Sequence, residues 1–448
     1  MSLQAVIDAL PPNAPEPIVE QRFTPAFIQA LGFDLSEMVP QFDTGKGPVD
    51  HAARANSDDD VFIERRTKPY LYVEVKGHDS ILAEDHRDYI RALNQLKRYL
   101  LAPNSESVQW GILTNSLRAQ LFRKHGSVIY PATPCLDCSD IDKVVQVFKE
   151  RIEAPDRGLT VAIYNNKGGV GKTTTTLNLT AALTLLGKKV LAIDFDPNQQ
   201  DLGDALNLPA SQGQMWEVLT NKGDIHSSIT TYRYKTPKGN REFSFDLILS
   251  DAKMASDPEV DEVKLRQYVR PNDLLKVLKS IKKSEYDYIF IDVPPNWRIF
   301  SQRAVCAADV VLMPVRHDNL HSIQNAGMAI TDLLPQVQDE RRKLGDSGPI
   351  ALPIFLNSWP SNVSQSQADV MHDAIARVIT EAKRDKDFNL LPFFYPRWTR
   401  SRRNKEIATI RYMAHIAKAD FHHVPATFCF KAAFEQYRNF AQEYFLWG

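Results

Sequence analysis

The chain has 448 residues, and its 54 Lys and Arg nearly balance its 55 Asp and Glu. This length allows two or three domains, and the balanced charge requires any nucleic-acid contact to come from a local basic patch. No apolar run approaches the roughly 18 residues that span a membrane, no basic-then-apolar leader opens the chain, and four cysteines argue against a disulfide scaffold. We therefore expect a cytoplasmic protein that is not attached to a membrane.

The first 150 residues place charged side chains within apolar segments. An amphipathic helix is predicted over residues 20–33, followed by a strand over residues 70–77 that carries Glu74 and Lys76 on one face. Two charges on an apolar strand are costly without a purpose. A helix is predicted over residues 85–101, with Gln95 and Tyr99 on one face, and strands over residues 109–115 and 118–123. The pattern predicts a small α/β domain with a charged site.

The order of the charged residues resembles that of PD-(D/E)xK nucleases, and more narrowly the N-terminal nuclease module of type I restriction motor subunits. The matching residues are Glu20, Asp50, Glu74, Lys76 and Gln95, although Val49 stands where the signature has proline. The resemblance implies that Asp50 and Glu74 hold Mg²⁺, with Glu20 completing the metal shell. It also implies that Lys76 stabilises the nucleophile or the transition-state charge, and that Gln95 and Tyr99 orient the phosphate or support the site. The alternatives are an α/β domain with a face of surface salt bridges that binds DNA without cutting it, and an unrelated domain.

Residues 165–174 read Asn-Asn-Lys-Gly-Gly-Val-Gly-Lys-Thr-Thr and carry a special form of the phosphate-binding pattern G-x-x-x-x-G-K-[ST], with a second lysine, Lys167, just ahead of the glycines. A predicted strand over residues 159–164 precedes them, and a predicted helix over residues 173–186 follows. Glycines let backbone N–H groups wrap phosphate oxygens, and the helix N-terminus adds positive charge. Lys172 would contact the β- and γ-phosphates of the nucleotide, and the Thr173 hydroxyl would contact Mg²⁺. The expected nucleotide-binding residues of this loop are Gly168, Gly169, Val170, Gly171, Lys172, Thr173 and Thr174.

Three carboxylates follow two later strands. A strand predicted at residues 189–194 ends near Asp194 and Asp196, and a strand at residues 286–292 ends at Asp292. Ligands of open α/β sheets sit beyond the carboxyl ends of the strands, so these carboxylates should converge on the phosphate loop. We expect Asp292 on the Mg²⁺ side, acting through a water, and Asp196 orienting the attacking water. Asp194 would support the metal environment or the nucleotide, or would instead cap a helix.

These segments resemble the ParA/MinD group of deviant Walker ATPases. The resemblance covers residues 158–448 and is carried by Lys167 to Thr174, by Asp194-Phe-Asp196-Pro and by Ile291-Asp292-Val-Pro-Pro. It implies a homodimer that sandwiches two ATP molecules, in which Lys167 reaches the partner's nucleotide and Lys172 acts in cis. The chain departs from the family in Asn166, where glutamine is usual, and in Asp196-Pro-Asn-Gln-Gln, where Asp-Pro-Gln-Gly is usual.

A basic stretch near residue 400 is the expected DNA contact. Members of the partition branch bind DNA without sequence preference, and five basic residues with no acid among them would give a salt-sensitive phosphate-binding surface. The alternative is an ordinary solvated loop. The residues are Arg397, Arg400, Arg402, Arg403 and Lys405.

The predicted organisation is a PD-(D/E)xK nuclease-like α/β domain over residues 1–150, a linker over 151–157 and a P-loop NTPase domain with a mostly parallel sheet over 158–448. We expect an ATP-dependent homodimer that uses ATP and Mg²⁺ and controls a DNA endonuclease, with a role in mobile-element biology or defence. The alternative is a partition or positioning ATPase whose N-terminal module binds nucleic acid without cutting it. A third hypothesis is a regulator that recruits a separate DNA-binding partner protein.

Overall fold

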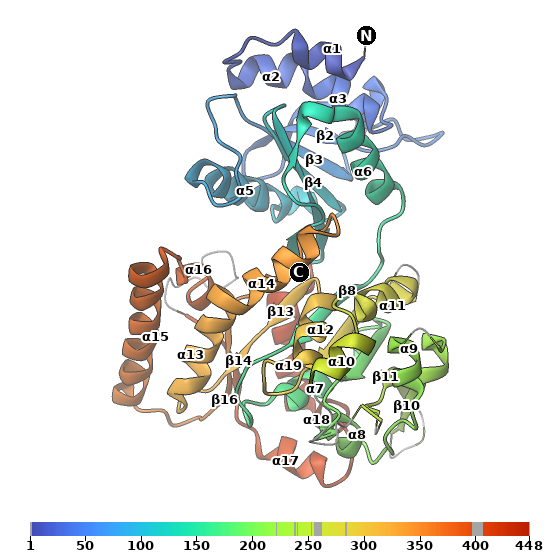
Figure 1. Ribbon diagram of the computed structural model, residues 1–448, viewed down its shortest axis with the longest axis vertical. Coiled ribbons are helices and arrows are strands. Elements are labelled where there is room, and N and C mark those ends of the chain that lie inside the picture. The colour runs from blue at the N-terminus through green and yellow to red at the C-terminus, as the bar shows by residue number, and fades with distance from the viewer. Residues whose placement is uncertain are drawn as a thin grey trace. The chain divides into compact units, whose positions relative to one another are not determined.

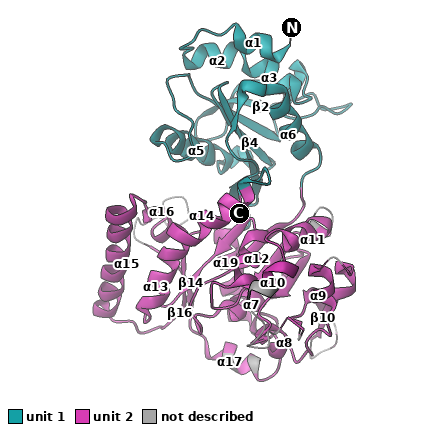
Figure 2. Ribbon diagram, in the orientation of Figure 1, with its two compact units in different colours: residues 1–155, 342–347, 445–448 teal, residues 156–341, 348–444 magenta. Residues whose placement is uncertain are grey.

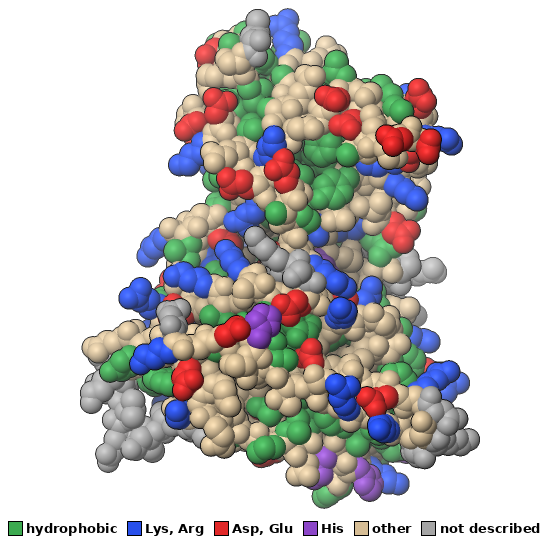
Figure 3. All heavy atoms as spheres, turned by 90° about the vertical axis from the view of Figure 1, so that its right-hand side faces the viewer, with side chains coloured by type: hydrophobic (Ala, Val, Ile, Leu, Met, Phe, Trp, Pro, Cys, Tyr) green, Lys and Arg blue, Asp and Glu red, His purple; other side chains and the backbone are tan. Residues whose placement is uncertain are grey.

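The computed structural model describes residues 2–447, except residues 221, 237–238, 240, 252, 255–261, 283–284 and 397–405. The chain forms two compact units (Figure 2). Unit 1 comprises residues 1–155, 342–347 and 445–448, and unit 2 comprises residues 156–341 and 348–444. Basic and acidic side chains are interspersed over the face that Figure 3 shows, as the balanced composition predicts.

Unit 1 begins with three short helices, α1 (Leu3–Asp8), α2 (Glu16–Arg22) and α3 (Thr24–Ala30). The prediction of one helix over residues 20–33 is wrong, because the chain forms two helices that meet at Phe23. Pro25 lies in the first turn of α3 and has no N–H to continue the hydrogen bonds of α2. Gly32 follows α3 with φ 104°, a conformation that glycine adopts without strain.

The sheet of unit 1 is mixed, with strand order β1-β2-β3-β4-β5-β6 and β7 paired with β5. Its strands are β1 (Met38–Asp43), β2 (Pro48–Ala53), β3 (Leu71–Val75), β4 (Trp110–Thr114), β5 (Arg118–His125), β6 (Val128–Pro131) and β7 (Leu136–Asp137). Only the β3–β4 pair is parallel, because helix α5 (Arg87–Leu100) connects these two strands as a crossover.

Helices cover both faces of this sheet (Figure 1). Helix α5 packs on one face with Tyr72 of β3, and α1–α3 and α6 (Ile141–Glu153) pack on the other with Val73. Because side chains alternate along β3, Glu74 points to the α5 face. Helix α6 continues to Glu153, so residues 151–153 of the segment expected to be a linker, 151–157, are helical. The remaining short elements are α4 (Phe62–Arg65), η1 (Leu35–Glu37), η2 (Pro103–Ser105) and η3 (Cys138–Asp140).

The main sheet of unit 2 has the order β10-β11-β9-β12-β8-β13-β15. Its strands are β8 (Leu159–Ile163), β9 (Val190–Asp194), β10 (Ile229–Lys235), β11 (Glu242–Ile248), β12 (Tyr288–Asp292), β13 (Val310–Leu312) and β15 (Ile350–Ala351). All pairs are parallel except the β10–β11 hairpin, so the predicted mostly parallel sheet is confirmed. Strands β8, β9 and β12 are completely buried, which explains their nearly continuous apolar sequence.

A second sheet joins β14 (Pro314–Val315), β16 (Phe355–Trp359) and β17 (Ala408–Arg411). Strands β13 and β14 follow each other closely in the chain but belong to different sheets, with Met313 between them. The last helix, α19 (Lys431–Tyr444), packs into the core through the buried side chains of Tyr437, Phe440 and Tyr444.

Further helices of unit 2 surround both sheets. They are α7 (Lys172–Leu185), α8 (Asp201–Ala205), α9 (Gln214–Leu219), η4 (Ile225–Ser228), α10 (Glu262–Tyr268), α11 (Asp273–Lys282), α12 (Ile299–Ala307), α13 (Leu320–Met328), the π-helix η5 (Ala329–Leu333), α14 (Leu334–Arg342), α15 (Gln365–Lys386), α16 (Leu391–Phe394), α17 (Ala414–Asp420) and α18 (Ala426–Cys429). In the part of the chain that the structure describes, no helix has the length and apolar character needed to cross a membrane.

Candidate functional sites

The glycine-rich loop of unit 2 joins the end of β8 to the start of α7. Gly169 and Gly171 have φ values of 73° and 88°, which glycine adopts without strain. A Cβ at Gly171 would lie 2.0 Å from Asn357 Nδ2, so only glycine fits there. A Cβ at Gly168 or Gly169 would meet nothing within 4 Å. The loop is therefore closed on the Asn357 side and open above Gly168 and Gly169, where phosphate oxygens have room.

Lys172 opens α7 and is buried at 8% exposure. Its Nζ donates to the backbone carbonyl of Lys167 at 3.3 Å, which folds the side chain back over the loop. Burial lowers the pKa of Lys172, and the charges of Asp292 and Asp196 oppose that effect only in part. This ammonium group lacks a direct carboxylate partner among the described residues, so it is available to an incoming anion.

Asp292 ends β12, in register with Ile163 of β8 and Asp194 of β9. Burial raises the pKa of Asp292 to about 7, although a hydrogen bond with the Thr173 side chain lowers it. Its Oδ1 is buried and has no hydrogen-bond partner. An unpartnered carboxylate oxygen beside a threonine hydroxyl fits a hydrated Mg²⁺, which prefers oxygen ligands and keeps several waters.

Asp194 and Asp196 follow the neighbouring strand β9. Asp194 Oδ2 accepts from the N–H groups of Leu202 at 3.2 Å and Gly203 at 3.3 Å, and its Oδ1 accepts from Asp196 N at 3.1 Å. Burial and then Asp292 raise the pKa of Asp194 to about 8. Because both oxygens bind backbone N–H groups near the start of α8, this geometry favours the helix-cap alternative for Asp194 over direct metal support.

Asp196 also holds a turn, since its Oδ1 accepts from the N–H groups of Asn198 at 3.1 Å and Gln199 at 3.2 Å. The turn ends at Gln200, whose φ is 55°. Asp201 follows, and it lies close enough to influence the pKa values of Lys172 and Asp292. The structure therefore brings Asp194, Asp196 and Asp292 together at the loop, and it adds Asp201, which the motifs do not include.

Three asparagines fix the loop, two of them, Asn357 and Asn325, from distant elements. Asn357 Nδ2 of β16 donates to Val170 O at 2.8 Å, and Asn325 Nδ2 of α13 donates to Asn166 O at 2.7 Å. Asn165 Nδ2 donates to the carbonyls of Pro314 and Ser322. A polar residue within the apolar strand over residues 355–359 is the one sequence signal that points to Asn357. The other two positions have no sequence signal.

The second candidate site lies in unit 1, where β3 carries Glu74 and ends just before Lys76. Lys76 Nζ donates to Glu74 Oε1 at 2.8 Å and to Glu16 Oε2 at 3.3 Å. Burial and the charge of Asp50 raise the pKa of Glu74 to about 8, although Lys76 lowers it. Glu74 is 1% exposed, and its Oε2 is buried without a hydrogen-bond partner. One oxygen of this carboxylate is therefore neutralised by the lysine, and the other is unpaired.

Asp50 lies on β2, and its Oδ2 accepts from Val75 N at 2.7 Å, which places it beside Glu74. Burial raises the pKa of Asp50 to about 6, and the neighbouring charges of Glu20 and Glu16 act in the same direction. Glu20 Oε1 in turn accepts from Gln41 Nε2 at 2.7 Å. The structure thus gathers Glu20, Asp50, Glu74 and Lys76 into one cluster. Glu16, which sequence reasoning missed, lies four residues before Glu20 and hence on the same face of α2.

The donor set of this cluster fits a divalent cation. Within the described ranges, no group of three or more His, Cys, Asp or Glu side chains has the arrangement of a metal site. Mg²⁺ is commonly held by one or two carboxylates, with water or phosphate oxygens completing the shell. Asp50 and the unpaired oxygen of Glu74 satisfy that requirement. Gln95 Nε2 instead donates to Tyr99 OH at 3.3 Å, and the structure gives it no hydrogen bond to Asp50, Glu74 or Lys76.

Two further residues of the phosphate loop, Lys167 and Thr174, are described by the structure, whereas the basic residues near position 400 are not. Lys167 is half-buried on the phosphate loop, and the carbonyl of Thr174 accepts from Asn178 Nδ2 at 2.9 Å. The residues proposed to bind DNA, namely Arg397, Arg400, Arg402, Arg403 and Lys405, lie outside the described residues.

A glycine loop between a buried strand and a helix N-terminus, faced by carboxylates at the ends of adjacent parallel strands, defines a P-loop nucleotide-binding protein. The AAA domain family model, AAA_31, matches residues 158–344. An uncharacterized ATP-binding protein of Methanocaldococcus jannaschii is 30% identical over 197 residues, which are 42% of this chain and 68% of that protein. Over residues 158–344, the chain belongs to the family of ParA/MinD-type P-loop ATPases.

Other similar proteins include the chromosome-partitioning ATPase Soj of Treponema pallidum, 36% identical over 159 residues that are 36% of this chain and 57% of that protein. The chain spans somewhat more than half the length of such curated relatives, 57% and 58% for two Soj proteins. Among solved structures, an ATP complex of Cyanothece McdA has a TM-score of 0.46 at 20% identity, covering 64% of this chain and 96% of that one. MinD of Pyrococcus furiosus has a TM-score of 0.41 at 22% identity, covering 64% and 98%.

Proposed function

We propose that the chain is an ATP-dependent, dimerising ATPase that controls a metal-dependent DNA endonuclease in unit 1. The observation that carries the nuclease assignment is the adjacent pair formed by the half-buried Asp50 and the buried Glu74, with Lys76 bonded to one oxygen of Glu74 and the other oxygen unpaired. Paired carboxylates beside a lysine suit phosphodiester hydrolysis, because they can hold a cation while the lysine neutralises developing negative charge.

In unit 2, ATP would lie on the phosphate loop with Mg²⁺ beside Thr173 and Asp292. Lys172 would bind the β- and γ-phosphates, because it is a buried cation without a carboxylate partner in direct contact. Asp196 would orient the attacking water. Cyanothece McdA has been solved in complex with ATP, and a MinD protein of Pyrococcus horikoshii in complex with Mg-ADP.

Lys167 is proposed to act on the nucleotide of the partner subunit. Lys167 is half-buried and directly precedes the exposed Gly168 and Gly169. Lys167→Ala should retain ATP binding and lose ATP-dependent dimerisation, measured by light scattering with a non-hydrolysable ATP analogue. If Lys167→Ala dimerises like the wild type, the proposed trans contact is wrong.

In unit 1, bound Mg²⁺ would supply Lewis-acid stabilisation of the phosphate and a nucleophile at neutral pH. Asp50 and Glu74 would hold the cation, and Glu20 would complete the set. Lys76 would steady the negative charge that develops on the phosphate. Gln95 is proposed to support the site through Tyr99.

Plasmid cleavage with purified full-length protein and Mg²⁺, with and without ATP, tests the nuclease proposal. Glu74→Gln and Lys76→Ala should each reduce cleavage by roughly a hundredfold or more. Lys143→Ala, an exposed substitution on α6, is the matched control and should cut normally. Undiminished cleavage by both site variants would mean that a contaminant or another site cuts the DNA.

The second candidate function is a partition or positioning ATPase whose unit 1 binds nucleic acid without cutting it. The similarity to proteins named chromosome-partitioning ATPase and chromosome partitioning protein favours it. It predicts ATP-dependent DNA binding with no cleavage under any metal condition. Binding lost on replacing the five basic residues at 397–405 would support the proposed DNA contact in either case.

A further inference from the structure

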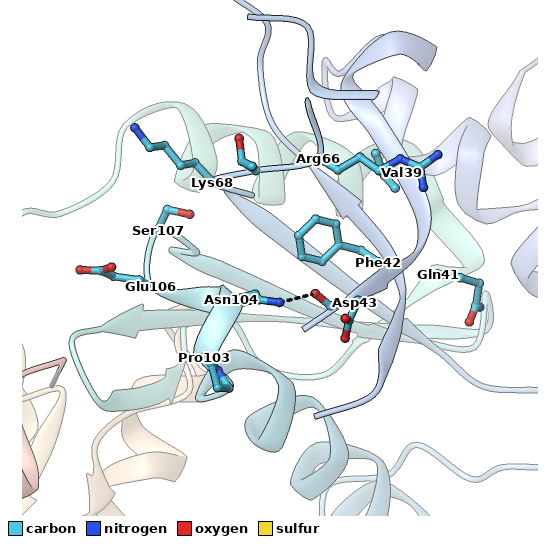
Figure 4. Close-up of a pocket in the computed structure, with 11 residues that line it drawn as sticks. Val39, Gln41, Phe42, Asp43, Arg66, Lys68, Pro103, Asn104, Glu106 and Ser107 are labelled. Carbon is cyan, nitrogen blue, oxygen red and sulfur yellow. Dashed lines mark hydrogen bonds between the residues drawn. The ribbon is translucent and has the colours of Figure 1, made fainter. Parts of the chain in front are cut away.

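Unit 1 contains a pocket of about 840 Å³ that neither candidate site uses. Figure 4 shows the Phe42 ring between the segment that carries Arg66 and Lys68 and the segment that carries Pro103 and Asn104. The volume is within the range of small-molecule sites, which is roughly 300–1,000 Å³. The lining residues are Val39, Gln41, Phe42, Asp43, Arg66, Thr67, Lys68, Pro103, Asn104, Glu106 and Ser107.

Strained backbone gathers around this pocket. Gln41, Arg66 and Lys68 have φ values of 47°, 51° and 53°, in the left-handed region that side chains with a Cβ rarely adopt. These are three of the nine non-glycine residues with positive φ in the described chain, and all three line one pocket. Such strain persists where surrounding structure holds it and tends to cluster at ligand sites.

The wall formed by residues 103–107 is rigid. Lys124, which is 3% exposed, donates from Nζ to the carbonyl of Ser105, and the Ser105 hydroxyl bonds Tyr72 OH at 3.0 Å. Asn104 N donates to Thr44 O at 3.0 Å, and its Nδ2 donates to Asp43 O at 3.1 Å. A wall held in this way is preformed for a ligand, which reduces the ordering cost of binding.

The chemistry of the lining suits a nucleotide. Pro103 is exposed, and with the small accessible part of Phe42, which is 6% exposed, it gives an apolar surface against which a planar base can pack. Asp43, Glu106 and the amide of Asn104 offer acceptors and donors for base edges, which carry both kinds of group. Arg66 and Lys68 are exposed cations at the rim, where a phosphate would remain partly hydrated.

The pocket lies on the same side of the sheet as Glu74. Phe42 packs 5.8 Å from the ring of Tyr72, which stands two residues before Glu74 on β3 and therefore points to the same face. Gln41 belongs to both places, because it lines the pocket and its Nε2 holds Glu20 of the carboxylate cluster. We propose that this pocket binds one nucleotide, with its base on Phe42 and its phosphate at Arg66 and Lys68. Two sources share this chemistry, a free mononucleotide and an unpaired nucleotide of a DNA strand.

Calorimetric titration of the full chain, carrying Lys172→Ala to silence the phosphate loop, tests the proposal without Mg²⁺. The probes are AMP, adenosine and a short single-stranded DNA oligonucleotide. The double variant Arg66→Gly/Lys68→Gly removes both cations, and glycine adopts the positive φ values of these positions without strain. It should weaken AMP binding about tenfold and leave the binding of adenosine, which has no phosphate, unchanged. Phe42→Leu should weaken both about fivefold, with thermal unfolding used to confirm that it folds.

The double variant Arg65→Ala/Lys143→Ala removes the same charge from exposed positions outside the pocket and should bind like the parent. Competition between AMP and the oligonucleotide would identify a nucleotide of a DNA strand as the ligand, whereas AMP binding without competition would identify a free mononucleotide. The proposal is overturned if neither AMP nor the oligonucleotide binds. It is also overturned if Arg66→Gly/Lys68→Gly and Phe42→Leu both bind with unchanged affinity. Because the readout is binding without cleavage, an inactive nuclease would not affect it.

Discussion

The two candidate sites both place a lysine beside buried carboxylates, but they use it differently. In unit 2, Lys172 reaches a backbone carbonyl, and burial lowers its pKa. In unit 1, burial also acts to lower the pKa of Lys76, but Glu74, Glu16 and Asp50 outweigh it and raise the pKa. Within the described part of the chain, Lys172 therefore has no carboxylate in direct contact, whereas Lys76 already contacts Glu74 and Glu16.

The two lysines therefore affect the stability of the ligand-free protein differently. A phosphate loop gains its counter-ion from the nucleotide, so its lysine adds little to the stability of the empty fold. The carboxylate cluster has an excess of acids, so its lysine stabilises the empty fold and a cation would supply the missing positive charge. Substitutions that separate ligand binding from stability can test the contrast.

The largest expected effect is the loss of nucleotide binding in Lys172→Ala. Removing the ammonium group should weaken binding of ATP with Mg²⁺ by roughly a hundredfold or more, since it removes a charge-assisted contact to two phosphates. The melting temperature without nucleotide should stay the same or rise, because a buried unpaired cation is lost. Calorimetric titration and thermal unfolding measure the two quantities. Lys188→Ala, at an exposed position just after α7, is the control. A large fall in the stability of nucleotide-free Lys172→Ala would mean that Lys172, like Lys76, stabilises the fold.

Lys76→Ala should behave in the opposite way. It leaves Glu74 buried without its cation, so the free energy of unfolding should fall by roughly 1–3 kcal/mol at neutral pH. The loss should grow as the pH rises above about 8, because Lys76 lowers the pKa of Glu74 and without it the buried carboxyl group ionises less readily in the folded state. Chemical denaturation at several pH values measures this change. The double variant Lys76→Ala/Glu74→Gln should recover most of the stability, and failure of that rescue would show that Lys76 stabilises unit 1 through packing alone.

The pH dependence of stability provides the next test. The pKa of Glu74 rises from 4.5 to about 8 on folding, so the folded state binds more protons than the unfolded state between these values. Stability contributed by this group is therefore lost as the pH rises through that window, by about 2 kcal/mol between roughly pH 6 and 8. Glu74→Gln should flatten the pH profile in part. Asp194 and Asp292 of unit 2, with pKa values of about 8 and 7, should keep the remainder of the slope.

Addition of Mg²⁺ sharpens this test, because a cation binds the ionised carboxylates. Stabilisation by Mg²⁺ without nucleotide should be larger near pH 8 than near pH 6, and Glu74→Gln should lose the part that belongs to unit 1. Equal Mg²⁺ effects in Glu74→Gln and the wild type would argue against cation binding at the cluster.

More of the phosphate loop than of the carboxylate cluster could be predicted from the sequence, for a physical reason. The phosphate loop is contiguous, so its strand, glycine turn and helix could be identified from residues 159–187 alone. The cluster of unit 1 depends on α2, β2 and β3 meeting in space, and its motif predicted Glu20, Asp50, Glu74 and Lys76 but missed Glu16. Contacts that come from distant elements, such as Asn357 on Val170, leave almost no local signal. The break at Phe23 was missed because amphipathic spacing continued across it while Pro25 interrupted the hydrogen bonds.

The smallest effect concerns Asn357, which fixes the phosphate loop from β16. Asn357→Ala removes the hydrogen bond to Val170 O, so ATP affinity should fall about fivefold and the free energy of unfolding by about 1 kcal/mol.

Gly171→Ala should lower the free energy of unfolding more than Asn357→Ala does. A Cβ at this position would lie 2.0 Å from Asn357 Nδ2, and the φ of Gly171 is 88°. In the Asn357→Ala background the clash disappears and only the backbone strain remains, so Gly171→Ala should become less costly there. Denaturation of the two single variants and the double variant measures this coupling, and purely additive costs would mean that the side chain of Asn357 does not restrict the loop. The corresponding glycine of unit 1 is Gly77, where a Cβ would lie 2.8 Å from the backbone nitrogen of Glu16. No side-chain truncation can relieve that contact, so Gly77→Ala should remain costly in every background.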